Sequence, residues 1–255
     1  MPLSIFLKII AFEGGLRIIN PMASTPTKQT LLDEVHGSLR EQILGGRFEP
    51  GSKLRIAVFA ADYGVSHTVV REAMTRLAGQ GLIVASPNRG FCVAPLSVDD
   101  LLDLTRARVL IETMALRESI TDGDLAWETR VLATHHTLQG TPDSTREGHV
   151  GGEWAQAHQA FHNALLSGTR SRRLESIATG LRDCSQLYQH WSVELAHDTD
   201  RDVAAEHRTI AELTLKRDAE RATQALAEHI ERTTATLIEY AQHSMHPDHA
   251  DDIPA

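Results

Sequence analysis

Apolar residues recur at helical spacing from residue 30 onward. The segment TLLDEVHGSLREQIL, residues 30–44, places apolar side chains every three or four positions, which predicts an amphipathic helix. A short helix is expected at about 56–63. A third helix is expected to begin after Ser66, because serine is a good N-cap. The buried stripe predicted for this third helix is Val70, Ala73, Met74 and Leu77.

Two short apolar runs follow the third helix. LIVA at 82–85 and FCVA at 91–94 flank SPNRG, whose turn residues predict a β-hairpin. A helix, then a helix-turn-helix, then a hairpin is the order of a winged helix. The first domain is therefore predicted to run from about residue 28 to 95.

The pattern after residue 97 is helical throughout. Ser97 is expected to cap a long helix to about residue 119, and further helices are predicted at about 124–138, 152–167, 171–197, 201–216 and 218–241. Apolar residues at helical spacing in the long helix are Leu101, Leu104, Leu110, Ile111 and Met114. The expected fold is mainly α, with an N-terminal winged helix-turn-helix and a C-terminal all-α helical bundle at 97–241.

Both ends of the chain are expected to lie outside these domains. Residues 1–27 are predicted to be a disordered or mis-started extension, with Met22 as a candidate start. IFLKIIAF at 5–12 is interrupted by Lys8 and is shorter than the roughly 20 residues that span a bilayer, so no membrane association is expected. Residues 242–255 are expected to form a disordered tail.

The distribution of charge indicates which part of the chain would meet a polyanion, and the cysteine content indicates the cellular compartment. Residues 1–95 carry a net charge of +3 and residues 96–255 a net charge of −12, within the total of −9. This asymmetry suggests that a polyanion would meet the N-terminal part. The two cysteines, Cys92 and Cys184, lack metal-type spacing, which favours a reduced, cytoplasmic protein.

The second helix of a helix-turn-helix enters the major groove with its N-terminal residues toward the base edges. Arginine can bind guanine bidentately, and serine and threonine hydroxyls can reach phosphates or bases. At the tip of the wing, a cation beside a glycine suits close approach to DNA. Each of these side chains taken alone could simply be solvated. The candidate DNA-binding residues are Arg55, Ser66, His67, Thr68, Arg71, Arg89 and Gly90.

Three segments of the first domain, EPGSKL, GVSHTVVREAMTRLAGQGLI and PNRGFCV, resemble the winged helix of the GntR family of bacterial transcription regulators. The resemblance implies binding to double-stranded operator DNA. The chain departs from the family pattern at His67, where arginine is usual, and at Val69, where proline is common. His67 removes one permanent cation from the DNA-binding face, so the operator sequence and the affinity are expected to differ from those usual in the family.

In the second domain, HQAFH at 158–162 places His158 and His162 on one face of a helix, where both can bind one metal ion. In a zinc protease of the H-E-x-x-H type a general base follows the first histidine, but here that position is Gln159. His207 and His229 fall on two later helices. A bundle could therefore collect four imidazoles around one divalent cation.

The segments RVLIE, HQAFHNAL and EHRTIAELTLKRDAERATQALAEHI resemble the all-α effector-binding domain of the FadR subgroup, called FCD. The resemblance implies a metal, commonly zinc or nickel, held by one aspartate and three histidines. His162, His207 and His229 fall at the three histidine positions, and His158 falls where aspartate is usual. Because an imidazole is neutral, it leaves the divalent metal with its full +2 charge. It also favours nitrogen-binding ions such as zinc, nickel or copper. Alternatively, His158 turns away and three ligands remain.

Together these features predict a homodimeric, metal-dependent regulator, expected to be a repressor that releases its operator when a small carboxylate binds. Arg108 is a candidate second contact for that acid, although it could instead only pair with Glu112. A competing hypothesis is a metal-dependent hydrolase or lyase, but Gln159 is no base and Glu206 is expected to point away from the site. A third is a DNA-binding protein whose bundle only dimerises, with its histidines empty.

Overall fold

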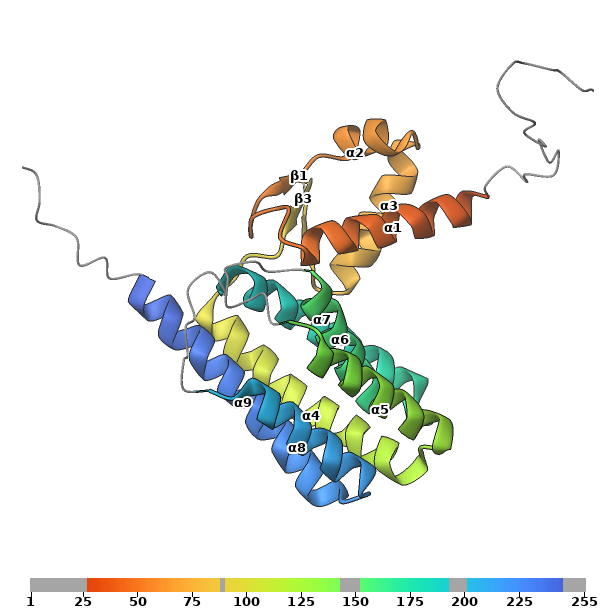
Figure 1. Cartoon of the computed structure of the whole chain (residues 1–255). Helices are drawn as coiled ribbons and strands as arrows, with labels where there is room; N and C mark the ends of the chain where they lie inside the picture. The colour runs from red at the N-terminus through yellow and green to blue at the C-terminus, as the bar shows by residue number, and fades with distance from the viewer. Residues whose placement is uncertain (1–26, 88–89, 143–151, 193–200, 245–255) are drawn as a thin grey trace, which may run out of the picture.

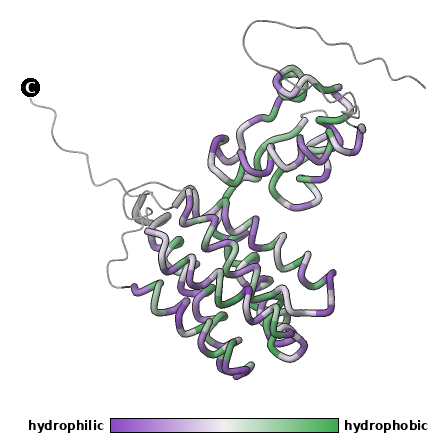
Figure 2. Tube along the Cα trace, turned by 45° about the vertical axis from the view of Figure 1, so that its right-hand side comes forward, coloured by the Kyte–Doolittle hydropathy of each residue, from purple (hydrophilic) through white to green (hydrophobic). Residues whose placement is uncertain are grey.

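The computed structural model describes residues 27–87, 90–142, 152–192 and 201–244. A small N-terminal domain sits on one end of an elongated helical bundle (Figure 1). Figure 2 shows hydrophobic and hydrophilic positions alternating along the helices of both parts, as amphipathic helices require. None of the described helices is long and apolar enough to cross a membrane.

The N-terminal domain is a winged helix, as predicted. Its elements are α1 (Lys28–Leu44), β1 (Lys53–Leu54), α2 (Ile56–Tyr63), α3 (His67–Gly79), β2 (Ile83–Ser86) and β3 (Gly90–Val93). The strands form an antiparallel sheet in the order β1-β3-β2. Strand β1 was not expected from the sequence. Its two residues pair with Cys92 and Phe91 of β3, and a strand this short has no periodicity to detect.

The apolar stripes of α1 and α3 meet in the core of this domain. Thr27, assigned from the sequence to the N-terminal extension, caps α1 by accepting the amide of Thr30 at 3.2 Å. Gly64 adopts a left-handed conformation with φ of 63° and ends α2. Buried residues of the stripes are Leu32, Val35, Leu39 and Ile43 of α1, and Val69, Val70, Ala73, Met74 and Leu77 of α3.

The second domain is all-helical in its described parts. Its helices are α4 (Val98–Asp122), α5 (Leu125–Gly140), α6 (Glu153–Leu166), α7 (Arg172–Ser192), α8 (Val203–Leu215) and α9 (Ala219–Ser244). The predicted helices agree with these to within a few residues, except that the predicted stretch 193–197 lies outside the described residues. Helix α9 extends to Ser244, beyond the expected end at 241.

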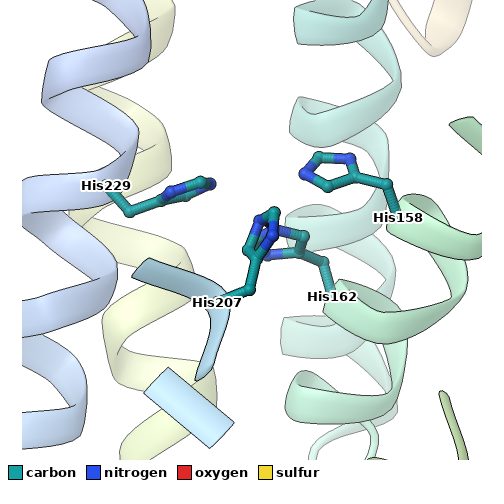
Figure 3. A group of neighbouring side chains, drawn as sticks. All are labelled: His158, His162, His207 and His229. Atoms are coloured by element: carbon teal, nitrogen blue, oxygen red, sulfur yellow. Dashed lines mark hydrogen bonds between the residues drawn. The ribbon is translucent and has the colours of Figure 1, made fainter. Parts of the chain in front are cut away.

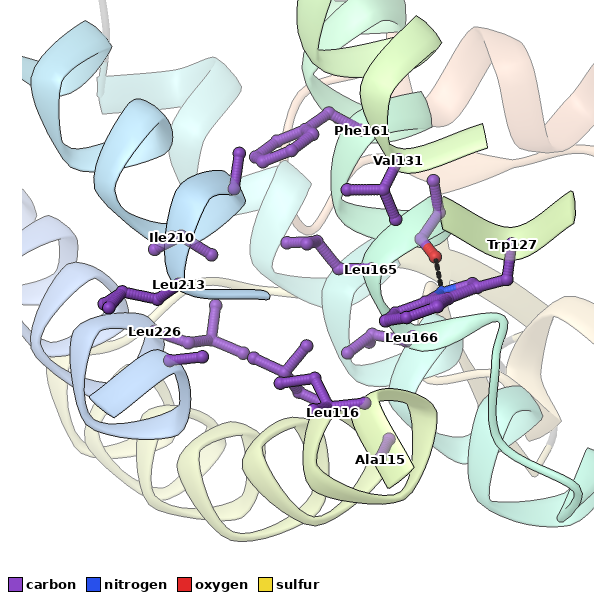
Figure 4. Close-up of a cluster of buried hydrophobic side chains, with 14 of the residues drawn as sticks. Ala115, Leu116, Trp127, Val131, Phe161, Leu165, Leu166, Ile210, Leu213 and Leu226 are labelled. Atoms are coloured by element: carbon purple, nitrogen blue, oxygen red, sulfur yellow. Dashed lines mark hydrogen bonds between the residues drawn. The ribbon is translucent and has the colours of Figure 1, made fainter. Parts of the chain in front are cut away.

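Figure 4 shows the bundle core, where Leu116, Trp127, Phe161 and Leu165 pack against residues of α8 and α9. The Trp127 indole Nε1 donates a hydrogen bond of 2.8 Å to the carbonyl of Ala164. This bond satisfies the only polar atom of a fully buried tryptophan side chain. The core therefore fixes α5 and α6 side by side, and α6 carries two of the histidines singled out from the sequence.

Candidate DNA-binding face and metal centre

The N-terminus of α3 presents a polar, exposed surface. Ser66, His67, Thr68 and Arg71 are all exposed there, as the helix-turn-helix pattern predicted. The Ser66 hydroxyl also accepts the amide of Val69 at 3.4 Å. Ser66 is therefore the N-cap of α3 as well as a candidate DNA contact.

Arg76, one turn beyond Arg71, is held differently. Its guanidinium lies 3.0 Å from a carboxylate oxygen of Asp33 on α1 and 3.9 Å from Glu72 on its own helix. Arg76 thus braces α3 against α1, which leaves Arg71 as the arginine at the exposed N-terminal end of the helix.

The wing and the start of α2 flank this face. Gly90 is exposed at the beginning of β3, with a φ of 82° that a residue with a side chain rarely adopts. Arg55 is exposed at the N-cap position of α2. Arg89, the predicted cation at the wing tip, lies outside the described residues.

Four histidines converge inside the bundle (Figure 3). His158 and His162 come from α6, His207 from α8 and His229 from α9. One ring nitrogen from each lies within 4.8 Å of the others, and the Nε2 atoms of His162 and His207 are 3.3 Å apart. Four nitrogens each bound to zinc at about 2.1 Å in a tetrahedron lie roughly 3.4 Å from one another. The cluster is therefore close to the dimensions of a coordination sphere.

The environment keeps these imidazoles neutral. His162, His207 and His229 are buried, while His158 is partly open and stacks on Trp154 with ring centroids 4.8 Å apart. Burial lowers the pKa of all four rings, and positive neighbours such as Arg182 lower the pKa of His162 further. A neutral imidazole has the free lone pair that metal binding needs.

Glu206 orients His229, contrary to the expectation that it would point away from the site. A carboxylate oxygen of Glu206 lies 2.7 Å from His229 Nδ1, so Nδ1 donates and Nε2 is free for a metal. Arg201 and Arg232 bind the same carboxylate at 2.7 and 2.8 Å. Although burial raises the pKa of Glu206, hydrogen bonds from His229 and Arg201 hold it far below its usual range. The error arose because the rotation of α8 against α9 is set by packing.

These residues fit a divalent cation. Four neutral imidazoles, at least one fixed by a carboxylate behind it, form a donor set that suits zinc or nickel. His158 lies within the cluster, so the geometry offers four ligands and not three.

A small, partly open cavity of about 20 Å³ adjoins the cluster, with room for about one water molecule. Arg108 lines it, donating from Nε to Glu112 at 2.6 Å and from Nη1 to Ser185 at 2.8 Å. The pairing with Glu112 left open by the sequence is therefore present, and Arg108 also faces the cavity. The other lining residues are His158, Gln159, His162, Arg182, Ser185, Gln186, Gln189, His229, Ile230 and Thr233.

Arg182 is a buried arginine in this wall that sequence reasoning missed. It is only 8% exposed, and its Nε and Nη1 have no hydrogen-bond partner among the described residues. An arginine on an amphipathic helix is ordinarily solvated, so no sequence signal distinguished it.

Helix α7 also contacts the N-terminal domain. Asp183, next to Arg182, accepts hydrogen bonds from both Nε and Nη2 of Arg40 on α1, at 3.0 and 2.5 Å. Asp183 accepts as well from Gln159, a cavity-lining residue, at 3.2 Å. Leu187, further along α7, is buried in the core cluster of the N-terminal domain.

A winged helix with an exposed α3, joined to a helical bundle, defines a DNA-binding transcription regulator. Residues 31–93 match the model of bacterial regulatory proteins of the gntR family, and residues 103–232 match the FCD domain. The chain belongs to the GntR family and carries an FCD domain.

Similar proteins support this assignment, and a solved structure shares the fold. The chain is 33% identical to the uncharacterized HTH-type transcriptional regulator BphR of Paraburkholderia xenovorans, over 83% of this chain and 87% of that protein. It is 31% identical to the HTH-type transcriptional repressor GlaR of Escherichia coli, over 75% of this chain and 89% of that protein. Its fold resembles Escherichia coli McbR/YncC, with a TM-score of 0.69, 22% identity and coverage of 82% and 97%.

Proposed function

We propose that this protein is a repressor whose operator binding is controlled by a small carboxylate captured at a divalent metal in the bundle. The observation that carries the proposal is the four-histidine cluster beside an arginine-lined cavity, enclosed by a helix that also contacts the DNA-binding domain. The similarity to the repressor GlaR supports the sign of regulation. A repressor that binds operator DNA in a bacterium would act in the cytoplasm.

In this proposal, Thr68 and Arg71 contact the major groove from the N-terminus of α3, with Ser66 and His67 beside them. Arg55 binds a phosphate, and Arg89 and Gly90 of the wing approach the backbone or the minor groove. Base contacts supply specificity, whereas the phosphate contacts position the domain.

The four histidines hold the metal in the same proposal. Bound there, zinc or nickel would supply a concentrated positive charge that attracts a carboxylate oxygen. Because all four ligands are neutral, the protein offsets none of that charge at the ligand positions. Arg108 adds a further cation at the cavity wall, partly balanced by Glu112.

Helix α7 is the route from effector to DNA in this proposal. The cavity has room for about one water molecule, so an organic acid must displace part of its wall. The wall includes Arg182, Ser185 and Gln186 of α7, and the same helix binds Arg40 through Asp183. Movement of α7 would then shift the equilibrium between arrangements of the DNA-binding domain.

The proposed dimer uses the exposed apolar face of α4. Leu102, Leu110 and Met114 are 50%, 61% and 54% exposed. Leu110 lies eight residues after Leu102 and four before Met114, so the three form one stripe along the helix. A second copy of the chain would cover this stripe. Dimerisation also suits a two-fold symmetric operator.

The lining of the cavity favours binding over hydrolysis. Among the described residues that line it, none carries a carboxylate that could act as general base. Glu206 lies behind His229 and is held by Arg201 and Arg232. The hydrolase or lyase hypothesis therefore gains no support from the described residues that line this cavity.

Gel retardation with fragments of the promoter nearest to the gene tests the proposal. Zinc-loaded protein should retard one fragment, and a small carboxylate should release it. Chelator-treated protein should retard the same fragment but lose the response to the acid. Retardation that is indifferent to acid and chelator would refute metal-dependent sensing, and no retardation of any fragment would refute the repressor.

A further inference from the structure

The wall of the cavity holds a positive charge that the described residues do not neutralise by hydrogen bonding. Arg182 is buried, and its Nε and Nη1 lack partners. Burial lowers the pKa of Arg182 to about 10, so the side chain stays protonated at neutral pH. A buried ionised group without partners is costly and is normally paired with an opposite charge.

The nearby carboxylates each bind another arginine, although Oε2 of Glu112 is buried without a hydrogen-bond partner. Glu112 binds Arg108 through Oε1, and Asp183 binds Arg40 bidentately. A second cavity-lining side chain on α7, Gln186, also has a buried oxygen without a partner. Arg182 and Gln186 are four residues apart, so they lie on one face of the helix. Unpartnered donors and an unpartnered acceptor thus share one wall beside the histidine cluster.

A divalent ion at the four neutral histidines would bring the uncompensated charge of the cavity to about three positive units, counting Arg182 and treating Arg108 with Glu112 as neutral. A monocarboxylate offsets only one of these units. An acid with two carboxylates offsets two of these units, and its second carboxylate can accept hydrogen bonds from the free N–H groups of Arg182.

We propose that the effector is a small dicarboxylate, with one carboxylate at the four-histidine site and the other bound by Arg182. This inference rests on the proposed function and adds the charge of the effector and the residue that selects it. Arg182 is then the specificity-determining residue, because its buried Nε and Nη1 have no hydrogen-bond partner among the described residues. Gln186 beside it completes the polar wall.

Isothermal titration of the zinc-loaded full chain tests the inference. The titrants are malonate, succinate, glutarate and adipate, each beside the monocarboxylate with the same number of carbons. The best diacid should bind on the order of ten- to a hundredfold more tightly than its matched monoacid, the worth of a charge-assisted hydrogen-bonded pair. Arg182→Gln should bring this ratio close to one while leaving zinc stoichiometry and monoacid binding unchanged.

Two further variants keep the test decisive. Gln186→Glu places a carboxylate within reach of Arg182, which would occupy the guanidinium and should weaken diacid binding at least tenfold. Because this variant keeps the buried cation, it serves as the test even if Arg182→Gln is unstable. Arg170→Gln changes an arginine whose side chain is 82% exposed and should leave every ratio as in the wild type.

The outcomes separate this inference from the proposed function. If zinc-loaded wild type binds both classes of acid equally, or if both α7 variants keep the preference for the diacid, the role of Arg182 is refuted while metal-dependent sensing stands. If zinc-loaded wild type binds no carboxylate of either class, the proposed function itself fails.

Discussion

At the scale of single residues, the chemistry of the candidate metal centre depends on side chains behind the histidines. His229 has two ring nitrogens, and the bond from Nδ1 to Glu206 leaves Nε2 free to face the cluster. Arg201 and Arg232 hold Glu206 in the ionised form that accepts this bond. The orientation of one ligand is therefore built from three residues outside the donor set.

Replacing Glu206 by glutamine keeps its shape but removes its charge. We expect Glu206→Gln to lower zinc affinity by about 10- to 100-fold, because a neutral amide oxygen accepts the Nδ1 hydrogen more weakly than a carboxylate and raises the basicity of the imidazole less. Competition with a chromophoric chelator measures the affinity. Glu212→Gln, on the same helix with its side chain 57% exposed, is the control. Equal zinc affinities for the two variants would show that Glu206 has no part in metal binding.

Arg71 and Arg76 make a matched pair for testing the DNA-binding face. Arg71→Ala should weaken operator binding about tenfold or more, because an arginine at this position can contact a base bidentately. Arg76→Ala should have a smaller effect, since Arg76 is engaged by Asp33. Fluorescence anisotropy with labelled operator measures both. The reverse order of effects would move the base contact away from the N-terminus of α3.

The sequence predicted some of these residues and missed others for a physical reason. His158 and His162 could be found because four-residue spacing places two side chains on one helix face. Arg182 and Glu206 could not, because the direction in which each points depends on how its helix is rotated in the bundle. That rotation follows from the packing of residues such as Trp127 and Phe161.

At the scale of elements, α7 serves both domains. Disrupting its contact with α1 should separate effector binding from the DNA response. Arg40→Gln should leave zinc binding within about twofold of the wild type, because Arg40 does not line the cavity. The acid is used at saturation, because the freed Asp183 carboxylate lies next to Arg182. The ratio of the operator affinity without the acid to that with the acid should fall toward one, since Asp183 no longer ties α7 to α1.

Anisotropy titrations with and without the tightest-binding acid measure this coupling. Arg47→Gln, which loses an exposed bond to Gln42, is the control. Arg40→Gln removes one partner of a largely buried ion pair, a change that can cost about 3–5 kcal/mol, so urea unfolding must first show that the variant is folded. A folded variant that responds like the wild type would exclude this route.

Helix α4 carries the prediction for assembly. Leu110→Glu places a charge in the exposed stripe and should convert a dimer into a monomer, because an interface would have to bury that charge unpaired. Size-exclusion chromatography with light scattering measures the molar mass. Zinc content should not change, since Leu110 is 61% exposed and does not line the cavity. Leu125→Glu, at 76% exposure on α5, is the control. A wild type that is already a monomer would refute the proposed interface.

The elements themselves were largely predictable from periodicity, with two instructive limits. Strand β1 exists because Lys53 and Leu54 pair with β3, a long-range contact that leaves no local pattern. In α4, helical spacing grouped buried Leu101 with exposed Leu110 and Met114. A long helix with two apolar faces shows a period but does not reveal which face meets its own core.

At the scale of the whole molecule, the buried histidines link stability to pH. The ordinary histidine pKa is 6.5, and burial lowers the pKa of His158, His162, His207 and His229 in the folded protein. Above about pH 6.5 the rings are neutral in both states, so stability is retained in full. As the pH falls below 6.5, the unfolded chain takes up protons that the folded protein does not, and the free energy of unfolding decreases.

Each such histidine contributes up to about 1.4 kcal/mol per pH unit between pH 6.5 and its lowered folded pKa. Urea unfolding of metal-free protein between pH 8 and pH 5.5 should therefore show a plateau and then a decline. His162→Leu removes one of these groups and should flatten the decline. Zinc-loaded protein should decline more steeply, because protons compete with the metal for the same nitrogens. Parallel profiles for wild type and His162→Leu would mean that acid acts on other groups, and the histidine cluster would then not control stability.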